Sequence, residues 1–133
     1  MTQPRWPDCI DDGYFVKGCL NTGYVVRERM EEMANQMANG GLTTTQVRRF
    51  FQHCRAIEAR LREQPTTWDS ERVEFMKLDA FAADGLAKKN IPQNFHDFIS
   101  RHVAAVKTKE DFLNGFLPHF EALVGFGSAY FKK

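Results

Sequence analysis

The chain has 133 residues, enough for one hydrophobic core but too few for two. Its 18 Lys and Arg nearly balance 17 Asp and Glu, and the formal charge of +1 excludes a protein that binds nucleic acid through bulk charge. Any surface that binds nucleic acid must therefore arise from basic residues gathered on one part of the molecule. No apolar run approaches the roughly 20 residues that cross a bilayer, so we expect no membrane-spanning segment and no membrane partner.

The cysteines indicate a reducing compartment. Cys9, Cys19 and Cys54 are odd in number, widely spaced and form no CxxC pair. The first residues contain prolines and acids but no apolar stretch, unlike a secretory signal. We therefore expect a cytoplasmic protein with reduced thiols, in which Cys54 fills the core.

The N-terminal third is predicted to form an irregular arm followed by a helix. Residues 1–22 contain several prolines and glycines and predict the arm. A first helix is predicted over 24–38, with Val25, Val26 and three methionines available for burial. Asn39-Gly40-Gly41 provides the glycine signal that ends it.

The second predicted helix, over 43–61, has the clearest start. Thr43 and Gln46 have the spacing of a capping box, in which the threonine hydroxyl accepts from the backbone and the glutamine reaches back to the cap. A helical projection gathers the apolar residues on one face: Val47, Phe50, Phe51, Cys54, Ile57 and Leu61.

Three further helices complete the prediction. One covers 69–88, with Val73, Met76, Ala80, Ala83 and Ala87 on one side and Phe75, Leu78, Phe81 and Leu86 widening the apolar surface, which predicts a central position. Pro92 suits the first turn of a fourth helix, and Thr108 starts the last, in which Pro118 marks a kink or a junction. The chain is thus predicted to be a single all-α domain over 1–133, a compact bundle of about five helices with an irregular N-terminal arm.

No catalytic or metal constellation is found in the sequence. The four histidines lie on three predicted helices without an HExxH or ExxH spacing, and His102 lies on an apolar face, as a core histidine does. The phenylalanines repeat at helical spacing beside Leu, Val and Ile, which favours core packing over stacking on bases. We therefore expect no enzyme, no metal and no cofactor.

Basic residues are concentrated on the second helix. Arg48, Arg55 and Arg62 follow one another at helical spacing, and Arg49 lies further round. These arginines are either a solvated face or a contact for a phosphate backbone, which a helix start with exposed amides also suits. We interpret them as unpaired cations and therefore as candidates for phosphate contact.

Several motifs together resemble a known family. Gly13-Tyr14-Phe15 followed by Gly18, Leu20 and Tyr24-Val25 is similar to the start of the small subunit of type III-A CRISPR effector complexes, the Csm small subunit family. Its helix start, LT-x-x-Q-hydrophobic-R, is matched by residues 42–48, and its closing helix by Phe112, Phe116, Phe120, Glu121, Ala122, Leu123 and Val124.

This resemblance implies a non-catalytic, RNA-binding subunit of the CRISPR ribonucleoprotein. Copies of such a subunit line a channel in which target RNA pairs with the guide, next to the backbone and large subunits. The expected RNA-binding residues, which contact phosphates without reading sequence, are Gln46, Arg48, Arg49, Arg55, Arg62, Lys77, Lys88 and Lys89. The alternative is a helical protein–protein interaction module without nucleic-acid binding, in which Trp6 or Trp68 docks a partner.

Overall fold

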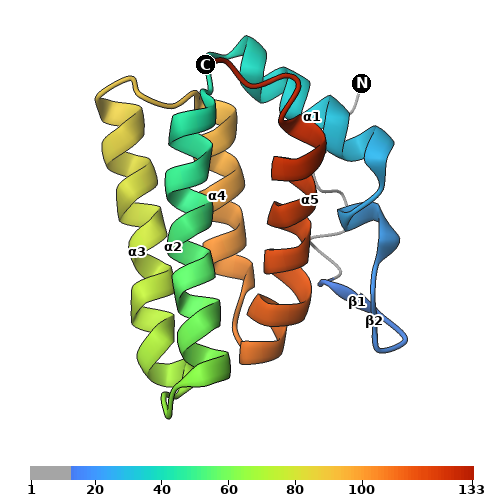
Figure 1. Ribbon diagram of the computed structural model, residues 1–133, viewed down its shortest axis with the longest axis vertical. Coiled ribbons are helices and arrows are strands. Elements are labelled where there is room, and N and C mark those ends of the chain that lie inside the picture. The colour runs from blue at the N-terminus through green and yellow to red at the C-terminus, as the bar shows by residue number, and fades with distance from the viewer. Residues whose placement is uncertain (1–12) are drawn as a thin grey trace.

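The computed structural model describes residues 13–133 (Figure 1). This part of the chain confirms the all-α prediction, since it contains five α-helices and one very small sheet. The helices are α1 (Arg27–Asn39), α2 (Thr44–Glu63), α3 (Trp68–Ala87), α4 (Gln93–Ala105) and α5 (Leu117–Gly127). In Figure 1, α2, α3, α4 and α5 run roughly along the long axis, and α1 crosses the end of the bundle near the C-terminus.

The arm contains a hairpin, so the prediction of an irregular segment was wrong at residues 15–20. Strands β1 (Phe15–Val16) and β2 (Cys19–Leu20) pair antiparallel. Lys17 and Gly18 connect them at φ 53° and 82°, the left-handed conformations that a tight two-residue hairpin turn requires. Residues 1–12, including Trp6 and Cys9, lie outside the described part of the chain.

The first helix begins later than predicted. A 3₁₀ turn, η2 (Thr22–Tyr24), precedes α1, and the Asn21 side chain accepts a hydrogen bond from the N–H of Gly23. Val26 is the residue before α1 and is 44% exposed, so its predicted burial was wrong. The three predicted methionines, Met30, Met33 and Met37, are buried as expected.

The second helix has the predicted start and apolar face. The Thr43 hydroxyl accepts from the N–H of Gln46 at 3.2 Å, which caps α2. The core-facing side chains of α2 are Val47, Phe50, Cys54, Ile57 and Leu61, as the projection predicted. Phe51 is half-buried and meets Phe120 of α5 edge to face at 5.3 Å between ring centroids.

The predicted core face of the third helix was only partly correct. Val73, Met76 and Phe81 are 57%, 50% and 47% exposed, and α3 lies at the edge of the bundle in Figure 1, not at its centre. Phe75 and Leu78, which were predicted to widen the apolar surface, face the core together with Ala82. Apolar residues surround this helix, so their spacing alone does not select a face. The neighbouring helices α2 and α4, which both pack against α3, decide it.

The last helix forms by the predicted signals but through an unusual turn. Thr108 and Asp111 cap each other, because each backbone N–H donates to the other's side-chain oxygen, at 3.3 and 3.0 Å. A π-helical segment, η3 (Asp111–Phe116), then leads into α5. Pro118 lies in the first turn of α5, where its missing N–H costs nothing, which confirms the predicted junction.

Aromatic rings fill the core, as the helical spacing of the phenylalanines predicted. The fully buried rings include Phe75, Phe95, Phe98, Phe112, Phe116 and Phe120. Two histidines, His102 and His119, are buried among them with their ring centroids 5.0 Å apart. The prediction that His102 is a core histidine is therefore confirmed. None of the helices described here is long and apolar enough to cross a bilayer.

Candidate nucleic-acid interface

The predicted RNA-binding residues of α2 lie on two flanks of that helix. Arg55 faces α5, because its guanidinium lies 4.0 Å from the Glu121 carboxylate. Arg48 and Arg62 share this flank, because each lies seven residues, or about two turns, from Arg55. Gln46 and Arg49 lie on the opposite flank, where they line a pocket against α3. A single arginine wall along α2 is therefore not present.

Of the three arginines at seven-residue spacing, Arg48, Arg55 and Arg62, the last two are paired with the same carboxylate. Glu58 contacts Arg55 at 3.0 Å and Arg62 at 3.1 Å. The Arg55 guanidinium also lies over the Phe51 ring, 5.7 Å from its centroid. The interpretation of Arg55 and Arg62 as unpaired was wrong, because Glu58 lies one turn from each on the same flank of α2. Both arginines remain about half exposed.

Arg48 and Arg49 differ from the other arginines of α2. Both side chains are exposed, and neither has an ion pair within residues 13–133. Arg60, which lies about three turns further along, is instead bound to the buried Glu71 of α3 at 2.9 Å. The first turns of α2 thus hold its uncompensated positive charge.

The backbone at the start of α2 is largely occupied. The N–H of Thr44 donates to the carbonyl of Lys132 at 2.7 Å, and the N–H of Gln46 donates to Thr43. Two of the first three amides therefore have partners, which weakens the predicted binding of phosphate by exposed amides. The same contact brings the exposed Lys132 and Lys133 to the start of α2. No local sequence pattern signals this pairing of residues about 90 positions apart.

The three predicted lysines lie on or just after α3. Lys77 donates to Glu74 at 2.9 Å, and this hydrogen bond lowers the pKa of the Glu74 carboxyl. Lys88 lies 3.1 Å from Asp84. Lys89 follows the helix at φ 62°, is exposed, and has no ion pair among the residues that the structure describes.

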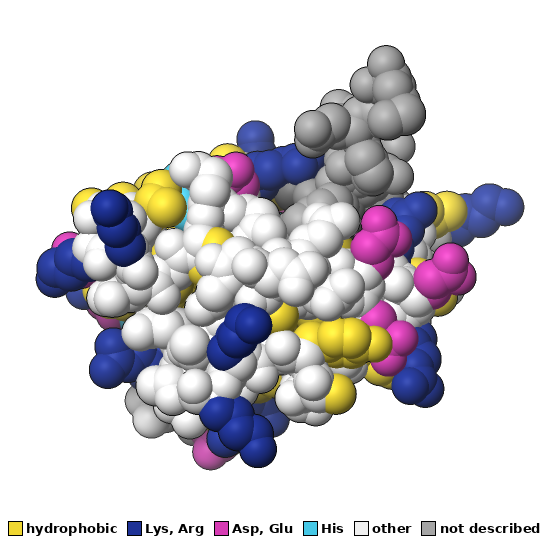
Figure 2. All heavy atoms as spheres, turned by 90° about the horizontal axis from the view of Figure 1, so that it is seen from above, with side chains coloured by type: hydrophobic (Ala, Val, Ile, Leu, Met, Phe, Trp, Pro, Cys, Tyr) yellow, Lys and Arg dark blue, Asp and Glu magenta, His cyan; other side chains and the backbone are white. Residues whose placement is uncertain are grey.

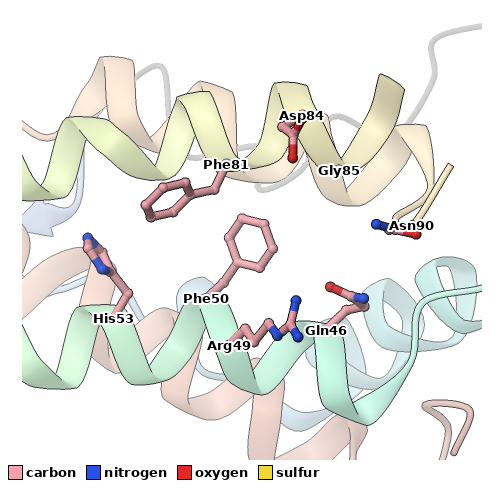
Figure 3. Close-up of a pocket in the computed structure, with 8 residues that line it drawn as sticks. All are labelled: Gln46, Arg49, Phe50, His53, Phe81, Asp84, Gly85 and Asn90. Atoms are coloured by element: carbon pink, nitrogen blue, oxygen red, sulfur yellow. The ribbon is translucent and has the colours of Figure 1, made fainter. Parts of the chain in front are cut away.

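A pocket of about 290 Å³ lies between α2 and α3. Its lining residues are Gln46, Arg49, Phe50, His53, Phe81, Asp84, Gly85 and Asn90. Figure 3 shows the aromatic side chains gathered at one end and the polar side chains at the other. The pocket adjoins Lys88 and Lys89, since Asp84 pairs with Lys88 and Asn90 follows Lys89. Two predicted site residues, Gln46 and Arg49, thus share one concave surface.

The end of the bundle that carries the start of α2 and the C-terminus is viewed in Figure 2. Lys and Arg side chains are spread over most of this face, including its right side, where most of the acidic side chains in this view also lie. The basic residues that the fold brings toward this end of the bundle are Arg48, Arg49, Lys88, Lys89, Lys132 and Lys133. The tertiary structure, and not α2 alone, therefore brings these six basic residues to one end of the bundle.

Comparison with known proteins identifies the family. The profile of the Csm2 Type III-A family matches residues 23–133, which is most of the chain. The chain belongs to the Csm2 type III-A family. Members of this family are small subunits of the multisubunit type III-A CRISPR effector complex and are generally non-catalytic. No curated protein and no solved structure matched the chain.

The match to the Csm2 family covers the part of the chain that contains the candidate site. It includes all five helices, the pocket and the basic end of the bundle, but only the final part of the N-terminal segment used in the resemblance. Within residues 13–133, no three His, Cys, Asp or Glu side chains gather as a metal site would require. The thiol of Cys54 is buried, and burial raises its pKa, which makes it a poor nucleophile.

Proposed function

We propose that this chain is an RNA-binding subunit that lines the channel in which target RNA pairs with the guide. The observation that carries the proposal is the pair Arg48 and Arg49, which have no carboxylate partner within the described residues. A guanidinium with no intramolecular partner is available to form two parallel hydrogen bonds to a phosphate. Lys89 supplies a further free cation near the same end of the α2–α3 pair.

The proposed contact does not read sequence. Arginine and lysine bind phosphate oxygens, which are the same at every nucleotide, so they position the strand but carry no base information. Pairing with the guide supplies the sequence information, as in other RNA-guided complexes. Arg55, Arg62, Lys77 and Lys88 join this surface only by exchanging their exposed carboxylate partners for phosphates. Such exposed pairs are weak, roughly 0–1 kcal/mol, so the exchange is inexpensive.

The exposed apolar face of α3 supports a second role in contacting proteins. Val73 and Met76 are half exposed, and Ala80 continues their stripe along the helix. Exposed apolar patches of this kind mark contact surfaces. We assign this face to neighbouring subunits of the complex, whether backbone subunit, large subunit or another copy. Trp68, the alternative docking residue, is half-buried, stacks on Phe112 and donates to the Lys107 carbonyl, which favours Val73 and Met76 for this role.

The salt dependence of RNA binding tests the proposal. The double variant Arg48→Gln/Arg49→Gln removes two free cations without touching the core. Binding of a fluorescently labelled single-stranded RNA to the full chain is measured by anisotropy between 50 and 200 mM salt. Each lost phosphate contact should reduce the slope of log affinity against log salt by about 0.7. We therefore expect a slope that is smaller by about 1.4 and weaker binding at low salt.

The variant Lys107→Gln/Lys109→Gln is the matched control. These two exposed lysines lie between α4 and α5, at the opposite end of the bundle, and their loss changes the net charge equally. The control should bind RNA nearly as the wild type does. Equal losses in the two double variants would mean that only net charge matters, and the proposed surface would be wrong.

A further inference from the structure

The pocket between α2 and α3 presents an aromatic wall to solvent. The Phe81 ring is 47% exposed, although phenylalanines elsewhere in the bundle fill the core. His53 holds it from one side, with ring centroids 5.4 Å apart in an edge-to-face arrangement. The His53 ring is itself fixed, because its Nε2 lies 2.7 Å from the carbonyl oxygen of Glu74 and donates to it. Phe81 is therefore held in place while one side of its ring remains uncovered.

The other end of the pocket carries groups that bind the edge of a planar polar molecule. Figure 3 shows Gln46, Asn90 and Asp84 around the opening opposite the rings. The amide side chains of Gln46 and Asn90 have no hydrogen bond within residues 13–133. Each amide offers both a donor and an acceptor, whereas Asp84 offers only acceptors. The pocket thus combines a π surface with unused donors and acceptors.

We propose that this pocket holds one unpaired base of the bound RNA, an inference that rests on the proposed function. A volume of about 290 Å³ lies at the lower end of ligand pockets, roughly 300–1,000 Å³, and suits a single base better than a larger ligand. Stacking on an aromatic ring is how proteins hold unpaired bases without strong sequence preference. The amides, which offer donor and acceptor alike, accept the edge of any base.

The basic side chains beside the pocket indicate the path of the RNA strand. Arg49 lines the pocket and has no ion pair among the described residues, so its guanidinium is placed to bind the phosphate of the inserted nucleotide. Lys89 immediately precedes Asn90 on the other wall and provides a contact for the next phosphate.

Phe81→Ala separates base contact from phosphate contact. It removes the ring but no charge, and at an exposed position it should leave the fold intact. The full chain is titrated with a single-stranded 12-nucleotide RNA and with the same RNA carrying abasic sites at alternate positions. We expect Phe81→Ala to weaken binding of the intact RNA by about 5-fold or more, with an unchanged salt slope. Binding of the abasic RNA should change less than about 2-fold, because the lost ring then has no base to stack on.

Val73→Ala is the matched control, because it also removes an exposed apolar side chain from α3 but lies outside the pocket. Phe81→Trp retains a stacking surface and should restore binding. Equal affinity of wild type and Phe81→Ala for the intact RNA, or equal losses for both RNAs, would overturn the base pocket. Either result is compatible with the proposed phosphate contacts if Arg48→Gln/Arg49→Gln still reduces the slope of log affinity against log salt. Unaltered binding in that double variant would reject the proposed function itself.

Discussion

The imidazole of His119 donates from Nδ1 to the backbone carbonyl of Tyr24 at 2.6 Å, across 95 positions of sequence. This hydrogen bond links α5 to η2, the turn that precedes α1. The donation assigns the proton to Nδ1 and leaves Nε2 unprotonated, buried and without a hydrogen-bond partner among residues 13–133. His102 lies beside it, with its Nδ1 2.7 Å from the Tyr14 hydroxyl. Both rings are therefore held in the core in their neutral form.

The buried histidines predict destabilisation by mild acid. Burial lowers the pKa of His119 to about 4 against the opposing effect of the Tyr24 hydrogen bond, and burial also lowers the pKa of His102 well below its usual value. Below pH 6.5 the unfolded chain therefore binds more protons than the folded chain. The free energy of unfolding is highest above that pH and decreases as the pH falls toward 4. His119 alone should lower the free energy of unfolding by about 3 kcal/mol over this window, with His102 acting in the same direction.

Urea denaturation at pH 7.5, 6.5, 5.8 and 5.0 measures this dependence. His119→Gln, which cannot titrate, should lose less stability than the wild type between pH 6.5 and 5.0. A wild-type unfolding free energy that stays constant over this range would contradict the burial of neutral histidines.

Leu78 and Met76 test which face of α3 meets the core. Leu78 is fully buried and Met76 is 50% exposed, two residues apart on the same helix. Leu78→Ala should lower the free energy of unfolding by about 2–5 kcal/mol, because it leaves a cavity. Met76→Ala should change it by less than about 0.5 kcal/mol, as surface substitutions usually do. Chemical denaturation of the two variants measures both changes in the free energy of unfolding. A larger loss in Met76→Ala than in Leu78→Ala would support the core face first predicted for α3.

Thr43 is expected to stabilise α2 through its cap. Thr43→Ala leaves the N–H of Gln46 without its 3.2 Å acceptor and should lower the unfolding free energy by about 1 kcal/mol. Thr45→Ala is the comparison, because Thr45 is exposed in the first turn of the same helix and does not cap it. Thermal melts of the two variants should differ by several degrees. Coincident melts would show that the cap contributes little.

Glu58 is expected to restrain RNA binding. Its carboxylate holds Arg55 and Arg62, so Glu58→Gln should release Arg62 for phosphate and leave Arg55 with only the longer contact to Glu121. Glu63→Gln changes the net charge equally, but Glu63 has no ion pair within the described residues. RNA affinity at low salt should rise more in Glu58→Gln than in Glu63→Gln, with a steeper salt slope. Equal gains would assign the effect to net charge and would place Arg55 and Arg62 outside the RNA surface.

Local signals made much of the fold predictable. Thr43 and Thr108 mark helix starts because a hydroxyl satisfies backbone amides within its own turn, and this bond depends on no distant residue. The apolar face of α2 was also correct, since its polar and apolar residues separate clearly around the helix. The hairpin at 15–20 was missed, because its two-residue strands are too short for an alternating pattern to appear.

The sequence by itself determined where α2 begins, that aromatic rings form a core, and that basic residues are concentrated on α2. Tertiary structure alone decided which face of α3 is buried and that Lys132 lies against Thr44. It also decided that Phe81 stands exposed opposite Gln46 in one pocket. Capping and helical spacing act within a few residues, whereas these arrangements depend on contacts between segments far apart in the chain. Such contacts form only where shape and burial across the whole core are satisfied together.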